Sequence, residues 1–108
     1  MKLVSAIIRP EKVNKVIEAL TEAGYYAFSK WCISGRGKQN GIQVGEVQYQ
    51  EMAKNILYIA VDDKEKDEVV DIIINNAKSG EHGYYGDGKV FISDISESYT
   101  ISEETRES

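Results

Sequence analysis

The stretch NILYIAVDDKEKDEVVDIIINNA, residues 55–77, decides the fold of this chain. Its first part, residues 55–61, is mostly apolar and rich in β-branched and aromatic side chains, which is typical of a strand. Asp62 and Asp63 follow, where acidic side chains cap the free amides of a helix and suit its dipole. Apolar residues then recur at helical spacing, at Val69, Ile72, Ile73 and Ala77. The stretch predicts a strand that leads directly into a helix.

The same pattern begins the chain. Residues 2–9 form an apolar run bounded by charge, and Pro10 stands in the first helical turn, where its missing amide costs nothing. The helical stripe that follows consists of Val13, Val16, Ile17, Leu20 and Ala23. Gly24 then supplies the left-handed cap that ends the helix. These residues predict a second strand–helix unit.

Two further strands are predicted over residues 26–34 and 89–95, which gives the order strand, helix, strand, strand, helix, strand. This order predicts an α+β, ferredoxin-like βαββαβ fold, with an antiparallel four-stranded sheet and both helices on one face. The other face is uncovered in a single chain, so we expect an oligomer that covers it. The candidates for this contact are Phe28, Trp31, Tyr58 and Phe91.

Composition limits the classes of partner. The chain has 108 residues, 42% hydrophobic and 29% charged, which suits one soluble domain; we expect it over residues 1–101, with a mobile acidic tail over 102–108. The 18 acidic and 13 basic residues argue against nucleic acid and anionic membrane surfaces as partners, and no apolar run predicts membrane insertion. Cys32, a single cysteine, is expected to be a small buried hydrophobe in a reducing, cytoplasmic location.

Two glycine-rich segments suit an anion. The first, GRGKQNG at residues 35–41, begins a long polar loop over residues 36–53, and loops of that length are generally functional or disordered. The second is GYYGDGK at residues 83–89. Glycines let backbone amides approach a phosphate closely, and the lysines add charge. Neither segment matches the P-loop pattern, and flexible turns without a ligand are the alternative.

The second segment continues into Gly86-Asp87-Gly88-Lys89-Val90-Phe91-Ile92, which resembles the Gly-Asp-Gly-Lys-Ile-Phe-Val signature of the PII nitrogen-regulatory signal proteins. Ala6-Ile7-Ile8-Arg9-Pro10, the segment Gly35-x-Gly-Lys-Gln39 and the order of elements are similar to the same family. Residues 35–45 resemble the branch that is associated with nitrogenase in archaea and anaerobic bacteria. The resemblance covers residues 1–101.

This resemblance implies a regulatory protein and no enzyme, assembled as a trimer of ferredoxin-like subunits. The trimer is either a homotrimer or a mixed assembly with a PII paralogue. ATP or ADP is expected in the clefts between subunits, and 2-oxoglutarate at the base of the long loop when Mg²⁺ and ATP are bound. Loop 36–53 is then expected to bind a target, the catalytic component of nitrogenase. No Ser/His/Asp, Cys/His or paired-carboxylate pattern in the sequence supports a catalytic role.

The resemblance also assigns residues by position. The nucleotide is expected to contact Ile7 through its base, and otherwise Gly35, Gly37, Lys38, Gln39, Gly86, Asp87, Gly88 and Lys89. The 2-oxoglutarate site is expected to consist of Gln39, Gly41 and Lys54, and Gln39 is also the expected Mg²⁺ ligand. Cations and backbone donors at close range suit a dicarboxylate beside a triphosphate.

The chain departs from the family pattern after the fourth strand. Where the family has an Arg-x-Arg-Thr-Gly run that holds the phosphates, this chain has Thr100-Ile101-Ser102-Glu103-Glu104. Acidic residues beside a triphosphate are unfavourable. Arg106 is the next basic residue and a possible substitute. The alternative to a nucleotide sensor is therefore a PII-like interaction subunit with lost or altered nucleotide binding.

The second glycine loop is also longer than the family pattern. Either Ser79-Gly80 matches the start of the family turn and three extra residues precede Gly86, or His82-Gly83 matches it and residues 79–81 lengthen the preceding helix. The second alternative keeps the spacing into Lys89, and we favour it here. It predicts that Tyr84 and Tyr85 line the cleft, with stacking on a nucleotide base or simple packing as the two possible roles.

Overall fold

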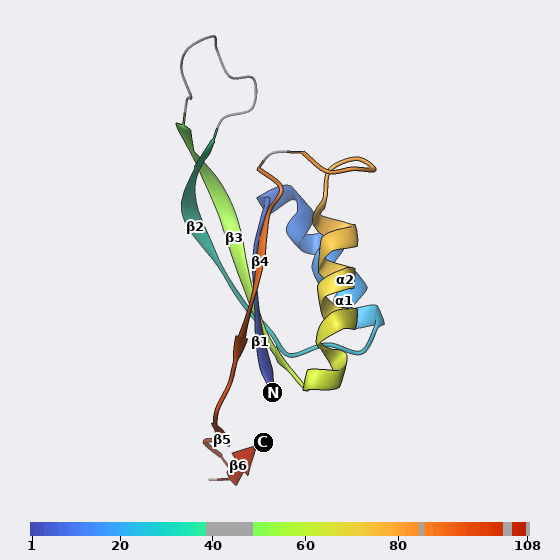
Figure 1. Cartoon of the computed structure of the whole chain (residues 1–108), viewed down its shortest axis with the longest axis vertical. Coiled ribbons are helices and arrows are strands. Elements are labelled where there is room, and N and C mark those ends of the chain that lie inside the picture. The colour runs from blue at the N-terminus through green and yellow to red at the C-terminus, as the bar shows by residue number, and fades with distance from the viewer. Residues whose placement is uncertain (39–48, 85, 103–104, 108) are drawn as a thin grey trace.

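The computed structural model describes residues 1–38, 49–84, 86–102 and 105–107. Within them, a four-stranded antiparallel sheet carries two helices on one face (Figure 1). The strands are β1 (Lys2–Ile8), β2 (Ser29–Lys38), β3 (Tyr49–Val61) and β4 (Gly88–Asp94), in the order β2-β3-β1-β4. The helices are α1 (Val13–Glu22) and α2 (Lys66–Ala77), preceded by the 3-10 turns η1 (Pro10–Lys12) and η2 (Asp63–Glu65). The predicted ferredoxin-like arrangement is confirmed.

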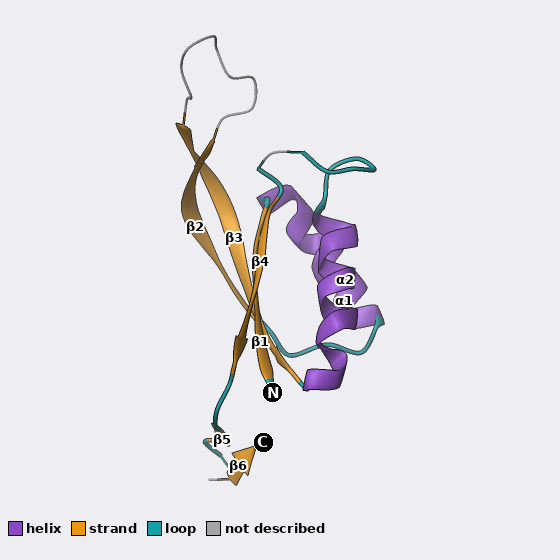
Figure 2. Ribbon diagram, in the orientation of Figure 1, coloured by secondary structure: helices purple, strands orange, loops and turns teal. Residues whose placement is uncertain are grey.

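The core lies between the sheet and the helices (Figure 2). Successive side chains of a strand point to opposite faces, and every second residue of the two central strands faces the helices. These residues are Val4, Ala6 and Ile8 of β1 and Leu57, Ile59 and Val61 of β3, all buried. The helices contribute Val16, Leu20, Val69 and Ile73, each 0% exposed. Burial of each of the larger side chains contributes roughly 1.5–3 kcal/mol, so this layer holds the fold together.

The open face of the sheet carries the other set of side chains. Tyr58 pairs with Ser5, which pairs with Phe91, so these three residues share a face. Trp31 lies on the same face and meets the Tyr58 ring edge-on, with ring centroids 4.7 Å apart. Trp31 and Phe91 are 42% and 52% exposed. Phe28, expected on this face, packs instead against the core cluster, because it precedes β2.

The helix starts differ from the prediction in one respect. Gly24 has φ 98° and follows α1, as expected for a left-handed cap. Asp62, in contrast, is the N-cap residue of η2 without a hydrogen bond from a helix amide to its side chain. Asp63 forms an ion pair with the Met1 amino group at 2.7 Å. The prediction that both acidic side chains cap the helix is therefore wrong, because at least Asp63 serves to tie the helix start to the chain terminus.

Strands β2 and β3 extend further than the sequence predicted. Backbone pairing continues from Ser34↔Ala53 to Lys38↔Tyr49, so the polar flanks of the expected loop 36–53 belong to a long hairpin. Residues 39–48 at its tip lie outside the described residues. Cys32 lies on this hairpin and is exposed, contrary to the expected burial. Strand β2 is an edge strand of the sheet, next to β3.

The C-terminal segment also contains more structure than the expected polar tail over residues 102–108. Strand β5 (Ser98–Thr100) pairs antiparallel with β6 (Thr105–Glu107), and Tyr99 is directly opposite Arg106. This hairpin lies at the end of the sheet opposite to the β2–β3 tip (Figure 1). The predicted mobile acidic tail over residues 102–108 thus includes residues that pair as a strand.

Candidate functional site

Three segments that are distant in sequence meet at the end of β1. Ile8 pairs with Gly88 on one side and with Asn55 on the other. The connection between α2 and β4 therefore returns to the sheet beside Arg9, which follows β1 directly (Figure 1). Lys54 precedes Asn55 on β3 and reaches past the end of β1. The sequence analysis predicted site residues on β1, on β3 and in the connection before β4, and the fold brings these three segments together.

Asp87 organises the loop. Its carboxylate accepts hydrogen bonds from the Ser79 amide and the Ser79 hydroxyl, both at 2.8 Å, and from the Tyr84 amide at 2.9 Å. Arg9 Nε donates a fourth at 2.9 Å and forms an ion pair with it. Burial acts to raise the pKa of Asp87, but these donors outweigh burial and hold the pKa well below its usual range. Asp87 is thus ionised, and it fixes the loop through hydrogen bonds from Ser79, Tyr84 and Arg9 of the same chain.

The end of α2 bears on the two alternatives for the longer loop. Helix α2 ends at Ala77, so residues 79–81 do not lengthen it, and this part of the favoured second alternative is wrong. Ser79 instead binds the signature aspartate through two hydrogen bonds. The connection over residues 79–84 thus folds onto Asp87. The sequence contained no signal for Ser79 as the partner, because the contact spans the whole inserted turn.

Backbone geometry explains why glycine occupies the loop's last positions. Gly88 has φ +118°, and a Cβ atom there would lie 1.7 Å from the Ile7 carbonyl oxygen. Gly86 has φ +88°, and a Cβ atom there would lie 3.1 Å from Arg9 Nη2. L-residues with side chains rarely adopt these φ values. The glycines thus allow a tight junction between β1 and β4, independent of any ligand.

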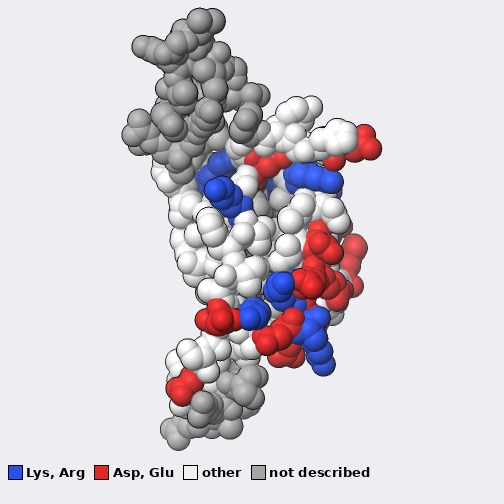
Figure 3. Space-filling view, in the orientation of Figure 1, with Lys and Arg blue, Asp and Glu red and all other residues white. Residues whose placement is uncertain are grey.

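Lys54 links β3 to this loop. Its side chain is 7% exposed, and its ammonium group donates a hydrogen bond to the Gly86 carbonyl. Burial, together with the nearby positive charge of Arg9, lowers the pKa of Lys54. A buried ammonium beside a guanidinium is electrostatically unfavourable and favours an anion as an additional neighbour. Figure 3 shows basic side chains around the base of this loop, whereas the larger groups of acidic side chains on this face lie lower, mainly toward the helical side of the molecule.

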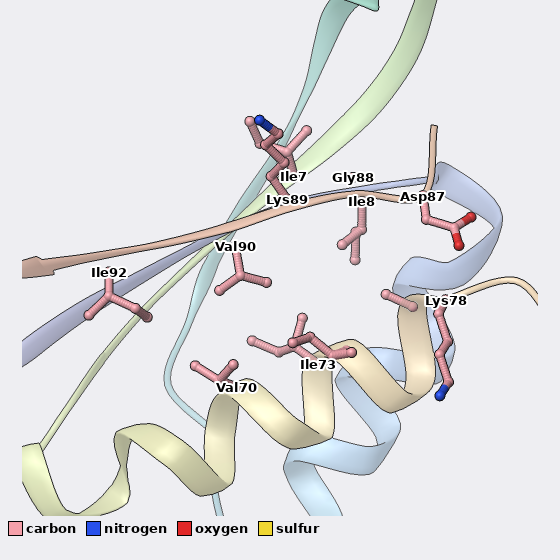
Figure 4. A pocket seen from close by; sticks show the side chains of 12 residues that line it. Ile7, Ile8, Val70, Ile73, Lys78, Asp87, Gly88, Lys89, Val90 and Ile92 are labelled. Atoms are coloured by element: carbon pink, nitrogen blue, oxygen red, sulfur yellow. The ribbon is translucent and has the colours of Figure 1, made fainter. Parts of the chain in front are cut away.

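A cavity on the outer side of the loop contains further polar groups. Its lining residues are His82, Gly83, Tyr84, Gly86, Asp87, Gly88 and Lys89. Lys89 is directly paired with Ile7, and both side chains point away from α2, onto the open face of the sheet (Figure 4). An apolar group on Ile7 and an anionic group between the glycine backbone and Lys89 fit this arrangement. Tyr84 lines the cavity as expected, whereas Tyr85 lies outside the described residues.

A second cavity, of about 290 Å³, lies on the opposite side of β4, against α2. Ile8, Val90 and Ile92 point into it from the sheet and Val70 and Ile73 from the helix (Figure 4). Asp87 and Lys78 border one end. The apolar lining does not suit a phosphate group.

The remaining predicted residues lie on or near the long hairpin. Gly35, Gly37 and Lys38 belong to β2, and the backbone of Gly35 pairs with Met52 on β3. Gln39 and Gly41 lie outside the described residues. Arg106, considered as a substitute for the missing arginines, belongs to β6, which lies at the other end of the sheet from the connection between α2 and β4 (Figure 1).

The described part of the chain has neither a metal-binding cluster of side chains nor a membrane-spanning helix. Residues 1–38, 49–84, 86–102 and 105–107 contain no group of three or more His, Cys, Asp or Glu side chains that is arranged to hold a metal ion. Over the same residues, neither helix is long and apolar enough to cross a membrane.

The chain is similar in sequence to several known proteins. A family model described as "Nitrogen regulatory protein P-II" matches residues 1–105. The "Nitrogen fixation nifHD region GlnB-like protein 1" of Methanothermococcus thermolithotrophicus is 52% identical over 101 residues, which is 94% of this chain and 93% of that protein. The "Nitrogen fixation nifHD2 region GlnB-like protein 1" of Methanosarcina barkeri is 48% identical over 102 residues, 94% of each chain.

A relative with a more general name is also similar. The "Nitrogen regulatory protein P-II 2" of Methanothermobacter thermautotrophicus is 38% identical over 101 residues, which is 90% of this chain and 85% of that protein. The matches thus extend over almost the whole chain.

Proposed function

The chain belongs to the nitrogen regulatory protein P-II family, and from this premise we propose that it senses ATP or ADP together with 2-oxoglutarate and regulates nitrogenase through loop 36–53. A nitrogen-regulatory role is supported by the family and by relatives whose names place them in nifHD regions. The role is regulatory and not catalytic. The further steps concern the ligands, the assembly and the target.

One observation carries the ligand proposal. Asp87, between Gly86 and Gly88, is held by hydrogen bonds within the loop, Lys89 lines the same cavity as the two glycines, and the buried Lys54 donates to the Gly86 carbonyl. Preorganised amides beside lysine side chains suit phosphate oxygens. The nucleotide base then rests on Ile7, which is paired with Lys89. Gly35, Gly37, Lys38 and Gln39 complete the site from the hairpin.

The second ligand is 2-oxoglutarate. We place one of its carboxylates on Lys54, because a buried ammonium close to Arg9 has a lowered pKa and gains most from an added negative charge. Gln39 and Gly41, which the family resemblance assigns to this ligand, complete the proposed site. Bound Mg²⁺ neutralises phosphate charge, and its preference for oxygen ligands suits the Gln39 side-chain oxygen. These residues couple the two ligands to the conformation of loop 36–53.

The assembly is a trimer, either of this chain alone or mixed with a PII paralogue. Its support is the open sheet face, where Trp31 and Phe91 are exposed although both are large and apolar. Burying such a patch is the usual reason for association. The target is the catalytic component of nitrogenase, and the support for it is the nifHD-region names of the relatives.

Calorimetric titration of the purified protein tests the ligand proposal. The expected result is micromolar binding of MgATP, and binding of 2-oxoglutarate only when MgATP is present. Gln39→Glu is expected to abolish 2-oxoglutarate binding without changing the thermal unfolding midpoint. Unchanged 2-oxoglutarate binding in this variant contradicts the role of Gln39.

A second function is favoured by one sequence observation. The family arginines that hold the phosphates are replaced here by Thr100 and Ser102, next to acidic residues. A PII-like interaction subunit with lost or altered nucleotide binding accounts for this replacement. Target binding that is indifferent to ATP, together with a flat ATP titration, supports this function over the sensor.

A further inference from the structure

We propose that the β5–β6 hairpin of one chain docks onto a second copy of this chain, where Ile101 inserts into the apolar cavity between β4 and α2. This inference rests on the proposed assembly and deepens it. It gives the trimer a second contact, in addition to the open face of the sheet, and assigns that contact to one side chain and one cavity.

The β5–β6 hairpin stands apart from the main sheet of its own chain. Within the described residues, β5 and β6 pair with each other and with no other strand. Figure 1 shows the hairpin beyond the end of the sheet. A two-stranded hairpin with three residues in each strand is marginally stable by itself in water. A surface of another molecule that packs against this hairpin therefore stabilises it.

Ile101 follows β5 and is 93% exposed, more than any other exposed large hydrophobic side chain of the described residues. Tyr99, two positions earlier, is 60% exposed. A single exposed isoleucine on a protein surface needs no explanation. Two large side chains on a short segment that projects from the sheet form an apolar tip, and such a tip suits an apolar recess on a partner.

The cavity between β4 and α2 has the size and lining for this side chain. It has a volume of about 290 Å³, and isoleucine, valine and alanine form most of its wall (Figure 4). Ile74 and Ile92 belong to this lining and are 45% and 41% exposed, so the cavity is open to solvent. A cavity of about 150 Å³ accommodates benzene, so this one accommodates an isoleucine side chain. Insertion removes apolar surface of both partners from water.

The charges of the two surfaces are opposite. Residues 97–107 contain four glutamates and one arginine. Lys78 borders one end of the cavity and forms no ion pair among the residues that the structure describes. Asp87 lies at the same end, but Arg9 neutralises its carboxylate. Complementary charge at the end of the cavity orients an acidic segment and fixes its register.

The positions of the two surfaces fit a closed ring. The hairpin lies beyond one end of the sheet, whereas the cavity extends along β4 to the glycine loop at the other end (Figure 1). A contact between two different surfaces is heterologous, and each copy then provides one hairpin and receives another. Such contacts form a ring when the rotation between neighbours closes, as it does in a trimer.

Disulfide cross-linking of the full chain tests this contact. All variants carry Cys32→Ser, which removes the exposed native thiol. Ile101→Cys is combined with Val70→Cys, since Val70 lines the cavity. Oxidation with copper phenanthroline is expected to give covalent dimers and trimers on a non-reducing gel. Because the open face also holds the trimer, a polar substitution at the edge of the cavity leaves it assembled, and cross-linking is the more direct measurement.

The matched control combines Ile101→Cys with Asp71→Cys. Asp71 is the next residue on α2, is exposed and does not line the cavity. A disulfide requires Cα atoms within about 7 Å, so we expect at least about ten-fold less covalent trimer from this pair. If Val70→Cys lowers the thermal unfolding midpoint, Ile92→Cys replaces it, because Ile92 lines the same cavity from β4.

The outcomes separate this contact from the assembly itself. Covalent trimers from a cavity pair, with little product from the Asp71 pair, support the insertion of Ile101. Equal yields from both pairs, or no product from either while light scattering shows a trimer, overturn the insertion and leave the proposed assembly intact. A wild-type protein that is monomeric by light scattering contradicts the proposed assembly, and this inference fails with it.

Discussion

The ammonium group of Lys54 donates a hydrogen bond to the carbonyl of Gly86, 32 positions away in the chain. This contact joins the base of the long β2–β3 hairpin to the glycine loop that precedes β4. The ammonium has three N–H donors, so an anionic ligand that binds Lys54 shares this group with the Gly86 carbonyl. A ligand at the hairpin base therefore affects the glycine loop directly, which gives the two proposed ligand sites a physical connection.

Replacement of Lys54 by methionine tests this connection. Lys54→Met keeps an unbranched side chain and removes the charge, so the desolvation cost of the ammonium and its hydrogen bond disappear together. We expect the free energy of unfolding to change by no more than about 1.5 kcal/mol, because these two effects oppose each other. Binding of 2-oxoglutarate in the presence of MgATP is expected to fall at least about 30-fold, the effect of removing one partner of a buried charge pair.

The control for this prediction is Lys30→Met. Lys30 lies on β2 of the same sheet and is exposed, so its replacement changes the net charge equally without touching the site. Calorimetry and urea denaturation measure the two quantities. Equal 2-oxoglutarate affinity in Lys54→Met and Lys30→Met excludes Lys54 as the carboxylate ligand.

Asp87 makes the stability of the protein dependent on pH. Hydrogen bonds from Ser79, Tyr84 and Arg9 lower its folded-state pKa in spite of burial, while the unfolded chain has the ordinary value of about 3.9. A lowered folded-state pKa stabilises the fold at every pH above the unfolded value, and the contribution is lost as pH falls below about 4. Asp87→Asn is therefore expected to lose about 2–4 kcal/mol at pH 7 and progressively less toward pH 3.

Urea denaturation at pH 7, 5, 4 and 3 and at one protein concentration measures this difference. Asp71→Asn serves as the control, because Asp71 is an exposed carboxylate on α2 that no contact ties to the loop. A difference between wild type and Asp87→Asn that stays constant across this range refutes the assignment of the pH dependence to Asp87.

Gly88 and Gly24 both have positive φ values but differ in their surroundings. Gly88→Ala places a Cβ atom 1.7 Å from the Ile7 carbonyl oxygen, whereas a Cβ atom on Gly24 has nothing within 4 Å. We expect Gly24→Ala to cost about 1 kcal/mol from backbone strain alone. Gly88→Ala is expected to cost well above about 3 kcal/mol, because β1 and β4 must separate. Similar thermal unfolding midpoints for the two variants contradict the tight β1–β4 junction.

The sequence predicted most of the fold because the periodicities in residues 2–24 and 55–77 are strong and local. The signature glycines, Lys54 and Lys89 meet at one end of β1, whereas their predicted role as a ligand site stays a prediction. Ser79 was not predicted as the partner of Asp87, because a side-chain contact across an inserted turn leaves no periodic signal. The extended hairpin was missed for a related reason: its flanks are polar and rich in glycine, and cross-strand pairing, not burial, makes them strands.

The open face of the sheet provides the last prediction. Phe91 lies on this face and is 52% exposed, and Trp31 packs edge-on against Tyr58 beside it. If this face forms the centre of a trimer, Phe91→Ser removes apolar area from each of its copies, at about 25 cal/mol per Å². We expect Phe91→Ser to shift the protein from trimer to monomer at micromolar concentration, measured by light scattering after size exclusion.

Ile74→Ser is the matched control: Ile74 is 45% exposed but lies on α2, on the other side of the sheet, and its replacement is expected to leave the trimer unchanged. A wild-type protein that is monomeric across this concentration range overturns the proposed assembly, and dissociation by both variants alike shows that the contact does not use the open face.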